Sequence, residues 1–172
     1  MTADALARVR ALRQRRAAAA HALAEAGARA EAGWDDLAHW PDWALLAPDR
    51  IEALAWACGA WLHAGALCHC IDGRVWDLLR ERVGPQACAM LRGEPASADS
   101  ALQLRDPVDT LFAESGRGVL LAGIEAPALR RALRALCWAG VPCTEWPALS
   151  PAAARALADR ALACLPAGKA AP

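Results

Sequence analysis

The sequence contains no tyrosine, one phenylalanine and a single lysine, Lys169, and it lacks the short motifs that mark common active sites. No Gly-Lys-Ser or Gly-Lys-Thr occurs, so there is no P-loop for nucleotide phosphates. There is also no His-Glu-x-x-His, no Cys-x-x-Cys and no Gly-x-Ser-x-Gly nucleophile elbow. Because β-branched residues never cluster, strand signals are nearly absent. These absences predict an all-α protein that is not an enzyme and that binds neither a metal nor a cofactor.

The composition sets the class of protein and its expected compartment. Nineteen basic and nineteen acidic residues cancel, so no overall field attracts the chain to nucleic acid or acidic lipid. At 172 residues the chain is long enough for one domain with a sizeable core. The seven cysteines are an odd number, and the N-terminal segment lacks the apolar run of a signal peptide. We therefore expect reduced thiols and a cytoplasmic protein.

The longest uncharged run, Ala53–Ile71, predicts a buried helix. Its nineteen residues meet the length of a membrane span, about 20 residues. However, most of the run is alanine, glycine or cysteine, and it contains His63 and His69, which disfavour insertion. Apolar residues lie on every side of this helix, as is typical of a helix surrounded by other helices. We predict that Ala53–Ile71 is the central helix and that the chain is soluble without detergent.

The same run carries the residue types that bind zinc, namely His63, Cys68, His69 and Cys70. At about 100° per residue, Cys68 and Cys70 point about 200° apart on a helix. His63 and Cys70 share a face but lie two turns, roughly 10 Å, apart along the axis. Four ligands would converge only if the helix broke near Leu67. We prefer the interpretation that the cysteines are core residues, because cysteine behaves as a small hydrophobe.

Helical periodicity predicts a single compact domain of about six to eight helices. We expect an N-terminal basic helix at 1–32, a helical core at 33–165 and a disordered tail at 166–172. Pro48, Asp72 or Gly73, Pro85, Asp106-Pro107, Glu125 and Ser150-Pro151 each predict a helix start, from caps, first-turn prolines and acids. Gly116-Arg117-Gly118 is expected to interrupt or end the helix that follows Pro107.

Two segments offer candidate partner-binding residues. Arginines crowd the first helix, and we select Arg13 and Arg16 as possible anchors for an acidic partner; the alternative is an ordinary solvated face. Trp34, Trp40 and Trp43 lie in a proline-rich segment. Tryptophan is favoured at interface hot spots, but in such a segment it also covers the outside of a core. Both interpretations of the tryptophans stay open.

Several short segments carry a resemblance to a known family. They are Trp43-Ala44-Leu45-Leu46, Leu54–Gly59, Ile71-Asp72-Gly73, Leu78-Leu79 and Val83-Gly84. This pattern resembles the accessory proteins of the type III secretion sorting platform, the SctK/YscK family. The chain departs from it where Trp43-Ala44-Leu45 replaces a more typical Trp-Leu-Pro.

The resemblance implies an all-helical cytoplasmic scaffold without an active site or cofactor. Such a protein docks on the cytoplasmic forkhead-type domain of an inner-membrane ring protein, and is therefore peripheral to the membrane. It also holds the cytosolic pods that recruit export cargo. Two other classes stay open from the residues alone. One is a small helical regulator or nucleic-acid-binding protein that uses the basic first helix. The other is a thiol or metal enzyme that uses Cys68, His69 and Cys70.

Overall fold

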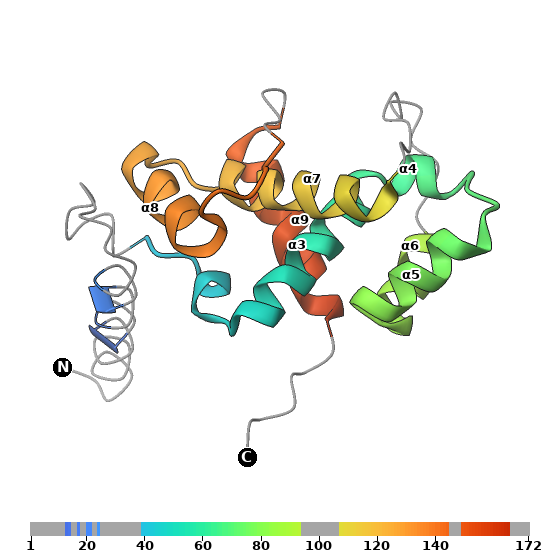
Figure 1. Cartoon of the computed structure of the whole chain (residues 1–172), viewed down its shortest axis with the longest axis horizontal. Helices are drawn as coiled ribbons and strands as arrows, with labels where there is room; N and C mark the ends of the chain where they lie inside the picture. The colour runs from blue at the N-terminus through green and yellow to red at the C-terminus, as the bar shows by residue number, and fades with distance from the viewer. Residues whose placement is uncertain are drawn as a thin grey trace, which may run out of the picture. The chain divides into compact units, whose positions relative to one another are not determined.

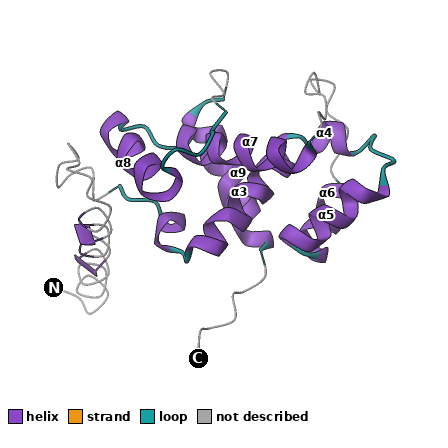
Figure 2. Cartoon of the chain, viewed as in Figure 1, coloured by secondary structure: helices purple, strands orange, loops and turns teal. Residues whose placement is uncertain are grey.

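The computed structural model describes residues 39–93, 107–144 and 149–165, together with positions 13, 14, 17, 20, 21 and 24. In these residues the chain forms seven α-helices, one 3₁₀-helix and no strand (Figures 1 and 2). The elements are η1 (Asp42–Leu45), α3 (Pro48–Leu62), α4 (Ala64–Leu67), α5 (Gly73–Val83), α6 (Pro85–Arg92), α7 (Val108–Ala122), α8 (Pro127–Trp138) and α9 (Pro151–Cys164). The all-α prediction is confirmed. The boundary expected after residue 32 falls outside the described residues, as does the tail expected from residue 166.

The helices pack into two units, which are described separately. The first comprises Met1–Ala47 and Ile124–Val141, and the second comprises Pro48–Gly123 and Pro142–Pro172. Among the described helices of both units, none combines the length and the hydropathy that a bilayer span requires.

Local sequence signals fix several helix starts. The Asp72 carboxylate accepts a hydrogen bond from the Arg74 N–H at 2.9 Å and caps α5. The Ser150 hydroxyl accepts from the Ala153 N–H at 3.2 Å and caps α9. Between α5 and α6, Gly84 has φ of 89°, a conformation that favours glycine. The predicted starts at Asp72, Pro85 and Ser150 are therefore confirmed.

The second unit is built on the crossing of α3 and α7. Ala55 and Gly59 lie one turn apart on α3, and Phe112 and Gly116 lie one turn apart on α7. Gly59 lies against the Phe112 backbone, whereas Gly116 lies against the Ala55 backbone, so the two helices cross antiparallel. A Cβ at either glycine would lie within 2.0 Å of the opposing carbonyl oxygen. The missing side chains thus let the two backbones touch.

This contact overturns the expectation that Gly116-Arg117-Gly118 interrupts or ends its helix. Instead, α7 runs without a break from Val108 to Ala122. Glycine in a helix costs about 1 kcal/mol relative to alanine. At Gly116 the close packing against the Ala55 backbone of α3 offsets that cost. The sequence shows the cost of the glycines and not the contact that compensates for it.

The prediction of one buried helix over Ala53–Ile71 is wrong at its C-terminal end. Helix α3 begins earlier, at Pro48, and ends at Leu62; α4 then covers Ala64–Leu67, and the chain leaves the helical path before Ile71. The capping of α5 explains the difference, because Asp72 must adopt an extended backbone to act as the cap. As a result Ile71, expected in the core, is 100% exposed.

The first unit buries one face of α8 together with η1. The face consists of Leu129, Ala132, Leu133 and Trp138, which are all buried. Trp138 stacks on Trp43 of η1, with ring centroids 5.8 Å apart and an interplanar angle of 26°. Arg130, Arg131 and Arg134 are exposed. The amphipathic helix predicted from Glu125 to Ala139 is therefore confirmed, within two residues at either end.

Candidate functional site

The basic candidates of the first helix are only partly described. Arg13 is helical and exposed, in keeping with either a solvated face or a partner contact. Arg16 and Trp34 lie outside the described residues.

The tryptophan candidates Trp40 and Trp43 are core residues of the first unit. Their side chains are 2% and 8% exposed, and Trp43 stacks on Trp138. In this conformation neither indole presents an area that a partner could cover. Burial therefore supports the interpretation that these tryptophans close the outside of a core.

A histidine and a serine meet in the interior of the second unit. His63 lies in the break between α3 and α4, and its Nε2 lies 3.2 Å from the Ser115 hydroxyl of α7. A nucleophile and its general base also have this spacing. However, His63 is 2% exposed and Ser115 is 0% exposed, so no substrate reaches them in this conformation. Burial lowers the pKa of His63 to about 4, which keeps the imidazole neutral at physiological pH.

Of the seven cysteines, three are buried and four, Cys68, Cys70, Cys137 and Cys143, are half-buried. Cys58, Cys88 and Cys164 are buried, and burial raises the pKa of each thiol, which disfavours the reactive thiolate. Cys68 and Cys70 lie in the α4–α5 loop, residues 68–72, and are half-buried. The Cys68 thiol donates to the Gly65 carbonyl at 2.9 Å, and thus folds back on its own chain. Across the described part of the chain, no group of three or more potential ligands is arranged to hold a metal ion.

The most unusual surface feature is Ile71 in the α4–α5 loop. Among the described residues, the other exposed large apolar side chains are Leu45 and Met90, which are 41% and 44% exposed, whereas Ile71 is 100% exposed. Figure 2 shows this loop in teal, running out from α4 and returning to α5. The surface position of Ile71 was not predicted, because the uncharged run Ala53–Ile71 assigned this residue to a helix. Asp72-Gly73 was the available signal, because a residue before a helix cap lies outside the helix.

Arginines cover three nearly buried tryptophans in the second unit. In each pair the arginine and the tryptophan come from different helices: Arg82 of α5 over Trp56 of α3, Arg160 of α9 over Trp61 of α3, and Arg92 of α6 over Trp76 of α5. The guanidinium carbons lie 5.4, 5.3 and 4.6 Å from the ring centroids, within the range of cation–π attraction. These contacts join neighbouring helices, a role that the sequence did not suggest.

No protein-family model matches the chain, and neither the curated proteins nor the solved structures give a match.

Proposed function

We propose that the chain is a non-catalytic cytoplasmic adaptor of a type III secretion sorting platform, linking the inner-membrane ring to the cytosolic pods. One observation carries the proposal. Ile71-Asp72-Gly73, a segment of the family resemblance, lies on the surface and presents a fully exposed isoleucine. An apolar side chain held in water contributes nothing to the core, but it suits burial against another protein.

Three other positions of the resemblance have a structural role in this chain. Trp43 makes the tryptophan stack, Gly59 permits the crossing of α3 and α7, and Gly84 forms the turn between α5 and α6. Each position has a structural reason for its residue type. These three residues serve the fold and not a reaction, which is consistent with a family whose members act as scaffolds.

The buried reactive groups also favour a scaffold over an enzyme. Cys58, His63 and Ser115 are sealed in the core of the second unit, where they fill space and join helices. Neither the thiol nor the imidazole is charged at neutral pH in these surroundings. Their placement supports a role in packing.

The proposal is tested with purified components and in cells. The chain should bind the cytoplasmic forkhead-type domain of the ring protein, measured by calorimetry, with the periplasmic part of the same ring protein as the control. Deleting the gene should stop secretion of all type III cargo and leave growth unchanged, and the wild-type gene should restore secretion. Normal secretion by the deletion strain, or turnover of a substrate by the purified protein, would show that the proposal is wrong.

A further inference from the structure

Hydrogen bonds hold the backbone on both sides of the exposed Ile71. Before it, the Trp76 indole N–H donates to the Cys70 carbonyl at 3.0 Å. After it, the Asp72 carboxylate accepts from the Arg74 N–H at 2.9 Å. Trp76 is itself 7% exposed and is covered by Arg92. The isoleucine is therefore held outward by a rigid helix start, and less conformational entropy is lost when it binds.

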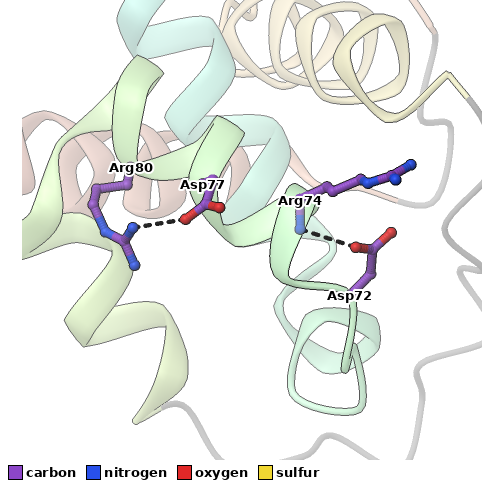
Figure 3. Close-up of polar contacts among 4 residues, drawn as sticks. All are labelled: Asp72, Arg74, Asp77 and Arg80. Carbon is purple, nitrogen blue, oxygen red and sulfur yellow. Dashed lines mark hydrogen bonds and ion pairs between the residues drawn. The ribbon is translucent and has the colours of Figure 1, made fainter.

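Two exposed charged side chains lie next to this isoleucine in the chain, the Asp72 carboxylate and, on α5, the Arg74 guanidinium. Further along α5, the Arg80 guanidinium pairs with the Asp77 carboxylate at 2.8 Å, so these two charges offset each other. The Asp72 carboxylate is engaged in the helix cap. Figure 3 shows the Arg74 side chain extending away from the Asp77–Arg80 pair. Arg74 is exposed, and its guanidinium has no ion pair among the described residues.

We propose that the α4–α5 loop is a docking site in which Ile71 enters an apolar pocket of a protein partner whose rim carries a carboxylate. Arg74 pairs with that carboxylate, since a guanidinium matches the geometry of a carboxylate with two parallel hydrogen bonds. Asp72 acts as a positioning residue, because its cap fixes the backbone beside Ile71. This inference rests on the proposed adaptor function and adds the site and the chemistry of the partner.

A protein pocket fits this loop better than a membrane does. Stable membrane association needs a broad apolar face or a second signal, and one isoleucine beside one arginine provides neither. By contrast, a single side chain that fills a closed pocket is a common source of binding energy between proteins. The Arg74 guanidinium, which has no ion pair among the described residues, suits a carboxylate on the rim of that pocket.

The first experiment uses the full chain and the purified forkhead-type domain of the ring protein and pod proteins. Ile71→Asp and Arg74→Glu should each weaken binding by about tenfold or more, as is typical of hot-spot residues. Asp72→Ala should also weaken binding, whereas Asp72→Asn keeps the cap acceptor and should bind like wild type. Ala89→Asp and Arg134→Glu are matched controls, since they place the same changes of charge at exposed positions on α6 and α8. All variants should melt like wild type except Asp72→Ala.

The outcomes separate this inference from the proposed function. Wild-type binding that is lost with Ile71→Asp and Arg74→Glu, and kept by both controls, supports the site. Equal binding by wild type, Ile71→Asp and Arg74→Glu overturns the site and leaves the adaptor function standing.

If the wild-type chain binds none of these partners, the proposed function is wrong. A second experiment then tests whether the α4–α5 loop is a docking site for another protein. A photo-crosslinker at position 71 is activated in cells that express the chain from its own promoter. Crosslinks to one protein, mapped to an apolar pocket with an acidic rim and lost with Arg74→Glu, support the site. Crosslinks to lipid, to a second copy of the chain or to nothing overturn it.

Discussion

Gly116 of α7 lies directly against the carbonyl group of Ala55 on α3. A Cβ atom at Gly116 would lie 1.6 Å from the Ala55 oxygen, and a Cβ atom at Gly59 would lie 2.0 Å from the Phe112 oxygen. Both obstacles are backbone atoms of a neighbouring helix, so a rotamer change cannot relieve them. The two glycines therefore set the distance between the helices on which the second unit is built.

We predict that Gly116→Ala and Gly59→Ala each lower the free energy of unfolding by about 3 kcal/mol, near the upper end of the usual cost of overpacking. Urea unfolding followed by circular dichroism measures the change. Gly73→Ala is the control, because nothing lies within 4 Å of a Cβ atom at the first residue of α5. That variant should be at least as stable as wild type. Equal stability of all three variants would mean that the helices do not cross closely.

His63 should make stability depend on pH. Its pKa is about 4 in the folded chain and 6.5 in the unfolded chain, so the unfolded state binds the proton more readily. The stabilisation is fully present above pH 6.5 and is lost as the pH falls towards 4, by a total of about 3 kcal/mol. His63→Gln should flatten the pH dependence of the unfolding free energy over this window. An unchanged slope in that variant would place the titrating group elsewhere.

The partly buried ion pair between α3 and α7 should contribute more than an exposed one. The Arg117 and Glu52 side chains lie 2.8 Å apart and are 14% and 40% exposed, against 51% and 73% for Arg80 and Asp77. We expect Arg117→Ala to cost about 2 kcal/mol, since it removes a guanidinium that is only 14% exposed and that also donates to the Pro142 carbonyl at 3.4 Å. Arg80→Ala should cost about 0–1 kcal/mol. Chemical denaturation compares the two, and similar losses would contradict the difference in burial.

The first unit should depend on its tryptophan stack. Trp138→Ala removes the partner of Trp43 and leaves a cavity, at an expected cost of about 3–5 kcal/mol. Trp138→Phe keeps an aromatic ring in the same place and should recover a large part of that loss. Near-ultraviolet circular dichroism reports the stack directly. A spectrum unchanged by Trp138→Ala would show that the two rings do not stack in solution.

Local signals allowed much of the fold to be predicted. The caps at Asp72 and Ser150 and the first-turn proline Pro85 act within a few residues, so the sequence alone identifies the helices that they start. Gly116 was misjudged because its effect depends on Ala55, sixty-one positions away in the chain (116 − 55 = 61). A local rule gives only the cost of such a glycine.

The residues of the candidate site were harder to predict from the sequence. Ile71 was assigned to the core because it is the last residue of the uncharged run Ala53–Ile71. The cap at Asp72 requires the chain to leave the helix before that run ends. Trp40 and Trp43 were left between two interpretations, since tryptophan is favoured in cores and at interfaces alike. Their burial in the described part of the first unit resolves which role their side chains have in this conformation.

The crossing of α3 and α7 also has a consequence for the order in which the second unit assembles. In the sequence, helices α4, α5 and α6 lie between α3 and α7. A long segment of chain must therefore close into a loop before Gly59 and Gly116 can pack against the opposite helix. Helices α5 and α6 are joined by Gly84 alone and can pair early. We therefore expect the rate of refolding to be set by the late meeting of α3 and α7. Pulsed hydrogen exchange should then show amides of α5 and α6 protected before those of α7.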